Sequence, residues 1–197
     1  MVNRKTDIDM LLGHARRRFC IYGYAGMSMA DLAGDCGLLK GSLYHYFPSK
    51  LALALAVLDQ DIELFRNKVF TLALESENDD ASVPLDRFCS GLSTLLKAEE
   101  PGESNEQTLV RNGAVIAHFA WDSAAEAELR DRLDIFFNEW ISVLAGILTP
   151  LMGAHRSVEL AADALARLLG GLAAVRINQG AEAMLRRLVS ELRSAVN

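Results

Sequence analysis

Apolar residues recur every three or four positions along almost the whole chain, and this spacing constrains the fold more than any other feature. It is typical of amphipathic helices, whereas exposed strands alternate every two residues, and no run of this chain sustains such alternation. Glycines and prolines fall between the periodic segments, where they end helices. With 197 residues, 51% of them hydrophobic, the chain can bury a core. The sequence therefore predicts an all-α protein of about nine helices.

The first predicted helix ends near Gly23. A short helix follows Ser28 and stops at Gly37, and another covers about 39–47, before Pro48. Ser49 is the expected cap of a fourth helix that continues to about Leu74. Further helices are expected at about 85–98, 107–121, 124–148, 157–179 and 181–195, with polar loops at 75–84 and 99–106 and a break at 149–153.

Two short helices joined by a tight turn containing glycine predict a helix-turn-helix within the first fifty residues. In the second of them, Leu43 and Phe47 lie four residues apart and can anchor the helix in the core. Lys40, Gly41, Tyr44 and His45 share a different face. These groups can contact phosphates and base edges in a DNA major groove.

The charge is uneven along the chain. Residues 1–50 hold seven Lys and Arg against four Asp, whereas the remainder holds 13 basic and 22 acidic side chains. A basic head on an acidic body favours a head that touches a polyanion, although so small an excess can also arise by chance. Arg16, Arg17 and Arg18 fall near the expected end of the first helix, where positive charge suits the helix dipole.

The segments Gly23–Ala33 (GYAGMSMADLA) and Gly37–Lys50 (GLLKGSLYHYFPSK) resemble the N-terminal sequence of TetR-family transcriptional regulators. The resemblance implies that the 39–47 helix is the recognition helix of a DNA-binding domain. It implies groove contacts from Lys40, Gly41, Ser42, Tyr44 and His45, and phosphate contacts from Ser28, Tyr46 and Lys50. Packing is the alternative role of the aromatic residues, above all of Tyr46, three residues after Leu43.

Two positions depart from the family pattern. Leu39 stands where the family often has a Ser or Thr that caps the recognition helix, and Leu51 stands where it often has Glu. Loss of the cap costs about 1 kcal/mol and one contact to the DNA backbone, so the departure bears on DNA affinity.

One helix-turn-helix reads only a few base pairs, which favours a homodimer on a palindromic operator. The last two helices carry broad apolar faces that predict a four-helix bundle between two subunits, as the resemblance also implies. Packing inside one subunit is the alternative for these faces. The candidate dimerisation residues are Leu165, Leu168, Leu169, Leu172, Met184, Leu185, Leu188 and Leu192.

The middle helices hold most of the remaining aromatic residues, and an apolar cavity with a few polar groups is the usual form of a small-molecule site. The resemblance implies that such a cavity receives an inducer, here a hydrophobic or aromatic effector. An ordinary core is the alternative. The candidate lining residues are Phe88, Leu92, His118, Phe119, Trp121, Phe137 and Trp140.

The sequence contains no catalytic motif, no metal-ligand spacing and no cofactor motif, so we expect neither an enzyme nor a metalloprotein. Three cysteines, Cys20, Cys36 and Cys89, show no paired spacing, which favours the cytoplasm. The longest mostly apolar stretch, 140–154, is shorter than the roughly 20 residues of a membrane span.

The interpretation is an N-terminal three-helix DNA-binding domain at 1–50 and a helical effector-binding and dimerisation domain at 51–197, in a repressor released by its effector. Two alternatives remain open at this point. One is an architectural or division-control DNA-binding protein of the same fold without an inducer. The other is a helical carrier or enzyme whose basic head is incidental.

Overall fold

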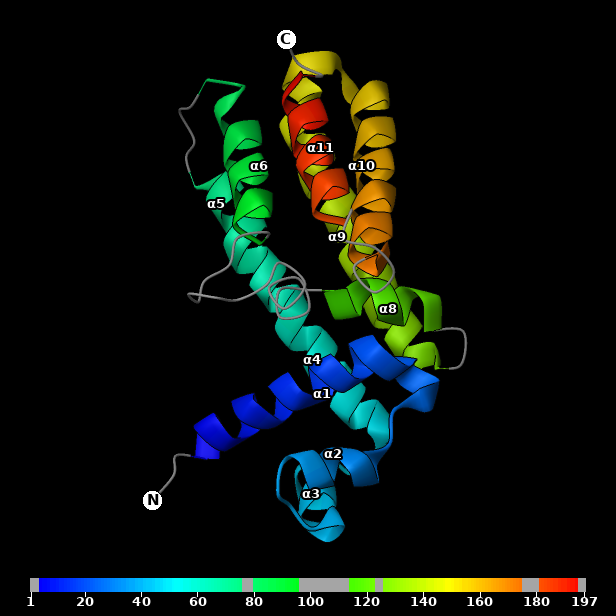
Figure 1. Ribbon diagram of the computed structural model, residues 1–197. Helices are drawn as coiled ribbons and strands as arrows, with labels where there is room; N and C mark the ends of the chain where they lie inside the picture. Colours follow the sequence, from blue (N-terminus) through cyan, green and yellow to red (C-terminus); the bar gives the residue numbers. More distant parts are fainter. Residues whose placement is uncertain (1–3, 76–79, 96–113, 123–125, 175–180, 195–197) are drawn as a thin grey trace.

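The computed structural model describes residues 4–75, 80–95, 114–122, 126–174 and 181–194, and all regular structure in those ranges is helical (Figure 1). The elements are α1 (Arg4–Gly26), α2 (Met29–Asp35), α3 (Lys40–Tyr46), α4 (Lys50–Phe65), a π-helical turn (Arg66–Phe70), α5 (Thr71–Leu74), α6 (Val83–Leu95), α8 (Ala114–Asp122), α9 (Ala127–Met152), α10 (Ala154–Ala174) and α11 (Ala181–Ser194).

One continuous rod is built from α4, the π turn and α5, because helical backbone angles persist through Phe65, Arg66, Phe70 and Thr71. It was expected as a single helix from Ser49 to about Leu74. When this rod is counted once, the described ranges contain nine helices, and the all-α prediction is confirmed.

The chain forms a small head and a larger body (Figure 1). The short helices α2 and α3 lie at one end, and α1 crosses between them and the body. The α4 rod leaves the head and runs into the body, where α5 packs against α6. On the other side α9, α10 and α11 pack together, and α8 contacts α1, α4, α9 and α10.

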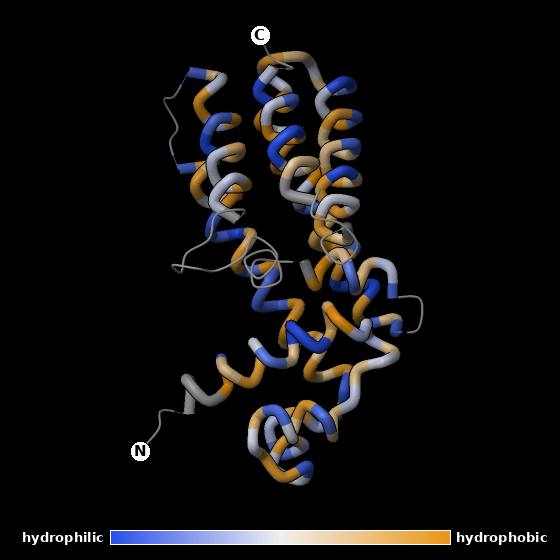
Figure 2. The backbone as a smooth tube through the Cα atoms, viewed as in Figure 1, coloured by the Kyte–Doolittle hydropathy of each residue, from blue (hydrophilic) through white to orange (hydrophobic). Residues whose placement is uncertain are grey.

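Head and body share one hydrophobic core. It runs without interruption from Leu11 and Phe19 in α1, through Leu43 in α3 and Phe65 in α4, to Leu192 in α11. Figure 2 shows that hydrophilic and hydrophobic residues are interspersed along α10 and α11. Each amphipathic helix turns one face to this core.

Several helix boundaries differ from the sequence prediction. The break expected at 149–153 falls on Gly153 alone (φ +82°). Pro150 does not end α9 but lies in its last turn. In the same turn, Thr149 Oγ1 donates a 2.7 Å hydrogen bond to the Ala145 carbonyl. α6 begins at Val83 rather than near 85, since proline is tolerated in a first helical turn. The expected helical stretches 107–113 and 175–179 lie outside the described residues.

Among the described helices, α9 has the length and apolar composition of a membrane span. Its buried residues include Leu129, Leu133, Phe136, Trp140 and Leu144, and their three- and four-residue spacing places them on one face. That face packs against α10, α4 and α6 in the core, as in a core helix of a globular protein.

Candidate DNA-binding surface and its links to the body

The helix-turn-helix is closed by local hydrogen bonds. Ser28 caps α2, where its Oγ accepts a hydrogen bond of 3.4 Å from the Asp31 amide. After α2, Gly37 adopts φ +64°, a left-handed angle that glycine reaches without strain, and the Leu38 amide then donates to the Ala33 carbonyl at 2.8 Å. This turn sets the angle at which α3 leaves α2.

Helix α3 is held in the head by Leu43, which is fully buried, and by Tyr46 and Phe47, which are half-buried against the core. The five candidate groove residues are all exposed: Lys40, Gly41, Ser42, Tyr44 and His45. The Lys40 ammonium lies 5.9 Å from the centre of the Tyr44 ring, in cation–π range. A Cβ added at Gly41 would meet open space, so packing within the chain does not require glycine there.

The three candidate phosphate residues lie in different surroundings. Ser28 is half-buried and occupied in capping α2, and Tyr46 packs partly against the core. Lys50, at the start of α4, reaches back over the segment that joins α1 to α2. Its Nζ donates to the carbonyls of Ala25 (3.2 Å) and Met27 (3.5 Å) and lies 4.7 Å from the Tyr24 ring centre. Lys50 thus has a positioning role within the chain.

The arginine run of α1 is structural to a greater extent than expected. The helical backbone of α1 breaks at Gly23 (φ 70°, ψ 176°), where the sequence predicted its end, so the three arginines lie just before the last turn of this helical stretch. Arg18 binds Asp35 of α2 through two hydrogen bonds of 2.5 and 2.8 Å. This contact neutralises part of the basic charge of the head.

Arg16 lies in a buried ion pair between α1 and α4. Its Nε donates to Asp61 Oδ1 at 2.7 Å, and Nη2 donates to Gln60 Oε1 at 2.7 Å. Asp61 is fully buried, its Oδ2 has no hydrogen-bond partner in the described part of the chain, and burial raises its pKa to about 7 despite Arg16. The sequence offered a signal that was missed, because Asp61 falls four residues from both Val57 and Phe65 on the apolar face of α4.

A second link joins α1 to the body at the kink on Gly23 (φ +70°). The Tyr24 amide donates to Asp122 Oδ2 at 2.7 Å, and the Tyr24 hydroxyl donates to Glu126 Oε1 at 2.8 Å. A Cβ at Gly23 would lie 2.5 Å from that same Asp122 oxygen, so only glycine admits the contact. Burial and Glu126 raise the pKa of Tyr24.

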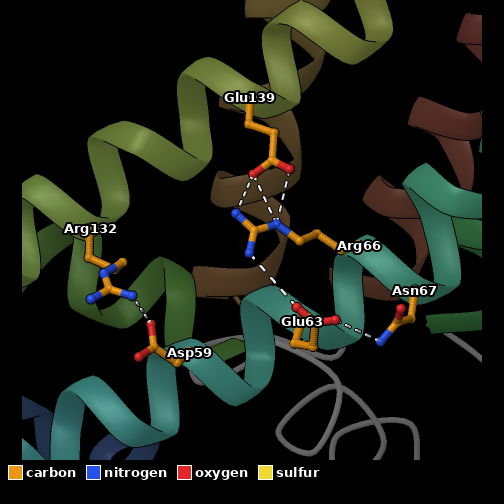
Figure 3. Close-up of polar contacts among 6 residues, drawn as sticks. All are labelled: Asp59, Glu63, Arg66, Asn67, Arg132 and Glu139. Atoms are coloured by element: carbon orange, nitrogen blue, oxygen red, sulfur yellow. Dashed lines mark hydrogen bonds and ion pairs between the residues drawn. The ribbon is translucent and has the colours of Figure 1, made fainter.

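A third link is a pair of ion pairs between the α4 rod and α9 (Figure 3). Arg132 Nη1 donates to Asp59 Oδ1 at 2.7 Å. Arg66, the first residue of the π turn, binds Glu139 through Nε at 3.0 and 3.1 Å and through Nη2 at 2.7 Å. Because α4 carries the head, these contacts position the helix-turn-helix relative to α9.

The candidate effector residues divide into two interior groups and one surface residue. Phe88, Leu92 and Trp140 are buried together with Phe70 and Phe136, and ring-centre distances include 5.4 Å for Phe88 to Trp140 and 6.3 Å for Phe70 to Phe88. Phe137 is half-buried and adjoins Phe136 at 6.0 Å.

Phe119 lies elsewhere, 5.0 Å from the Phe19 ring in the α1–α8 contact, and His118, beside it in the chain, is half-buried. Trp121 does not lie in the interior as expected, since it is 74% exposed at the end of α8. The sequence prediction missed Phe65 and Phe70, whose rings pack 5.8 and 6.1 Å from Phe136.

Most of the candidate dimerisation residues are buried within one subunit, in agreement with the alternative of packing inside the subunit. Leu165, Leu168, Leu172, Leu188 and Leu192 are each no more than 6% exposed in the isolated chain, because α10 and α11 turn these faces toward each other, α9 and α6. Leu169 is half-buried and Met184 is 51% exposed. The side chain of Leu185 lies outside the described residues.

Comparison with known proteins agrees with this architecture. Residues 11–57 match the family model of bacterial regulatory proteins, tetR family. The chain is 34% identical over 70 residues to the uncharacterized HTH-type transcriptional regulator YuxN of Bacillus subtilis, a match that covers 36% of this chain and only 23% of that protein. It is 28% identical over 137 residues to the HTH-type transcriptional regulator LmrA of the same organism, over 68% of this chain and 67% of LmrA.

A TetR transcriptional regulator from Legionella pneumophila has the same fold over the full length. Its crystal structure superposes with a TM-score of 0.75 at 21% identity and covers 100% of this chain and 99% of that one. Together with the exposed α3, these matches show that residues 11–57 form a helix-turn-helix DNA-binding domain of the tetR family of bacterial regulatory proteins, in a chain that has the fold of TetR transcriptional regulators over its full length.

Proposed function

We propose that this regulator is a homodimeric repressor that binds a palindromic operator through α3 and leaves it when a small hydrophobic or aromatic effector binds the body. The observation that carries the proposal is the geometry of α3, in which one fully buried residue, Leu43, leaves five polar or small residues exposed together. A helix of this kind enters the major groove, and a two-fold symmetric pair of such helices reads two half-sites.

The exposed faces of α10 and α11 are our candidate dimer interface, in place of the buried leucines. They offer Ala162, Ala166 and Met184 as exposed residues and Leu169 and Gly170 as half-buried ones. A Cβ at Gly170 would meet open space, so this side of α10 can approach another helix closely. Two such helices from each subunit would form a four-helix bundle.

For the effector, we propose the aromatic cluster between the α4 rod, α6 and α9, formed by Phe70, Phe88, Phe136 and Trp140. The indole Nε1 of Trp140 is buried and has no hydrogen-bond partner in the described ranges. Because an orphaned buried donor costs about 1–3 kcal/mol, an effector that carries a hydrogen-bond acceptor on an apolar frame would relieve this cost. This feature favours a ligand role for the cluster over an ordinary core.

The same cluster adjoins the links between body and head. Phe65 directly precedes the π turn and Phe70 is its last residue, while Arg66, its first residue, binds Glu139 on α9. An effector that spreads α4 from α9 would shift the population of dimers toward a spacing of the two α3 helices that no longer fits half-sites about 34–36 Å apart. Residues 1–50 would then act as the DNA-binding domain and 51–197 as the sensing and dimerisation domain.

We place the protein in the cytoplasm, because its DNA target is there in a bacterium and its three cysteines, Cys20, Cys36 and Cys89, form no disulfide in the described part of the chain. The test begins with the purified full-length chain and fragmented bacterial DNA. Retained fragments are sequenced, and binding to the enriched site is measured by fluorescence anisotropy. A chain that stays monomeric and ignores all duplex DNA at low salt would refute the proposal.

The effector is sought separately by thermal shift against a panel of apolar aromatic compounds that carry acceptor oxygens. A ligand at 100 times its dissociation constant stabilises the native state by about 2.7 kcal/mol and, as an inducer, releases the operator. The matched control is Trp140→Phe, which removes the indole donor and keeps an aromatic ring at this position. Specific DNA binding without any ligand that shifts it would favour the architectural alternative.

A further inference from the structure

Leu39 is the most exposed large apolar side chain in the described part of the protein, at 81%. It lies directly before Lys40, at the N-terminal end of the recognition helix. Single exposed apolar residues are common on protein surfaces, so exposure alone assigns no role. The position of Leu39 is what makes this exposure informative.

Leu39 occupies the N-cap of α3 with extended backbone angles (φ −70°, ψ 145°), yet it makes no side-chain cap. The caps of the neighbouring helices are serines that do bond. Ser28 Oγ accepts from the Asp31 amide and Ser49 Oγ accepts from the Ala52 amide at 3.0 Å. A leucine in this position forgoes a stabilising cap and also fails to pack, so its side chain contributes little to the fold.

The surroundings of Leu39 in a DNA complex follow from the docking of helix-turn-helix proteins, in which the N-terminal residues of the recognition helix contact base edges in the major groove. The apolar group that bases display there is the C5-methyl of thymine. The neighbouring exposed groups of α3 are an ammonium, a glycine and a hydroxyl, on Lys40, Gly41 and Ser42. At the N-terminal end of α3, Leu39 is the side chain whose apolar surface can pack against this methyl group.

We propose that Leu39 is a specificity-determining residue that reads a thymine methyl group in each half-site of the operator. The inference rests on the sequence-specific DNA binding proposed above. Burial of one methyl group corresponds to about a fourfold change in the dissociation constant. Two symmetric half-sites would together give about 15-fold.

The experiment uses the full-length protein and a site enriched from a random duplex library. Each thymine of the site is replaced in turn by deoxyuridine, in both half-sites at once, since deoxyuridine lacks only the C5-methyl. We expect the wild type to lose about 15-fold in affinity at one symmetric thymine position. The variant Leu39→Ala should bind the thymine and deoxyuridine versions of that position equally.

Two further variants separate the contact from folding. Leu39→Ser supplies a capping side chain, so it should unfold no earlier than the wild type and should still ignore the methyl. Ile135→Ala removes another apolar side chain, one that is 61% exposed on α9, outside the helix-turn-helix, and should keep the wild-type response to deoxyuridine.

The proposal is overturned if the wild type and Leu39→Ala lose the same factor at every thymine, or if neither responds to deoxyuridine. It is also overturned if Leu39→Ala weakens selected and random duplexes equally, which would assign the residue to the DNA backbone. A library that yields no enriched site refutes specific binding itself. An enriched site that is indifferent to the methyl refutes only the role of Leu39.

Discussion

The DNA-binding head and the α10–α11 pair are both built from amphipathic helices, yet they bury their apolar faces in different ways. In α3, Leu43 is fully buried and the predicted groove residues are exposed. In α10 and α11, five of the predicted dimerisation leucines are buried in the subunit itself. A helix of seven residues has one narrow apolar anchor, which fixes its orientation. A helix of 21 residues with a broad apolar face can bury that face against several partners.

The largest effect on stability is expected from substitution of Arg16, which links the head to α4. Arg16→Ala would leave the Asp61 carboxylate buried without its counterion, which costs about 3–5 kcal/mol of unfolding free energy. Urea denaturation at pH 8 measures this loss, and Arg17→Ala, which removes an exposed side chain of the same run, should cost less than about 0.5 kcal/mol. Equal effects of the two substitutions would mean that Arg16 is a surface residue.

Two substitutions two residues apart in α10 test which of its faces is buried in the subunit and which is exposed. Leu168→Ala should destabilise the subunit by about 2–5 kcal/mol, since Leu168 is 6% exposed within the core. Ala166→Glu places a charge on the exposed face and should disrupt the proposed dimer while the helical content persists. Urea unfolding and sedimentation velocity measure the two effects. If Leu168→Ala instead yields a stable monomer, the buried leucines do form the interface.

The contact between Arg16 of α1 and Asp61 of α4 should make the stability of the protein depend on pH. The pKa of Asp61 is raised to about 7 from an ordinary value of 3.8, so the folded state holds this proton more tightly than the unfolded chain does. Between about pH 4 and pH 7, ionisation of Asp61 therefore opposes folding, and the free energy of unfolding should fall as pH rises, by at most about 1.4 kcal/mol per pH unit.

Asp61→Asn removes that titration, so its unfolding free energy should depend less steeply on pH over the same window. The absolute stability of the variant is not the readout, because Arg16 also loses its counterion. Urea midpoints of both proteins at pH 5, 6 and 7 provide the two slopes. Parallel curves would show that Asp61 stays ionised throughout.

Gly41 sharpens the assignment of the recognition face. Gly41→Ala should raise the stability of the free protein by up to about 1 kcal/mol, because alanine has the higher helix propensity and its Cβ meets open space. The same Cβ would stand between α3 and the groove and should weaken operator binding. Thermal unfolding and anisotropy titration measure the two changes. A variant that is more stable and binds DNA unchanged would place Gly41 away from the groove.

The smallest expected effects distinguish phosphate contacts from base contacts. Lys50→Ala should weaken binding to all duplexes and lower the slope of log affinity against log salt by about 1, whereas Tyr44→Ala should cost more on the operator than on random DNA. An unchanged salt slope would leave Lys50 with only its bonds to the Ala25 and Met27 carbonyls. Equal losses on both duplexes would mean that Tyr44 does not discriminate sequence.

Residues far apart in the chain explain why part of the site could not be predicted. The hydrogen bonds of Tyr24 to Asp122 and Glu126 join positions about a hundred residues apart. The sequence around Tyr24 does not indicate these partners, and the sequence around the two carboxylates does not indicate Tyr24. The α4–α9 ion pairs have the same character (Figure 3). Surface carboxylates and guanidinium groups are common along both helices, and only the crossing of the helices selects Asp59 for Arg132 and Glu139 for Arg66.

The sequence by itself determined the all-α class, the helix-turn-helix, the exposed face of α3 and the single rod that follows it, because each depends on periodicity, caps and turns within a few residues. The tertiary structure decided which faces of α10 and α11 are buried, that Trp121 lies at the surface, and that Arg16 forms a buried pair with Asp61. Those outcomes depend on which helix lies opposite. An apolar or charged side chain is compatible with more than one neighbour, so its partner is chosen only when the whole chain packs.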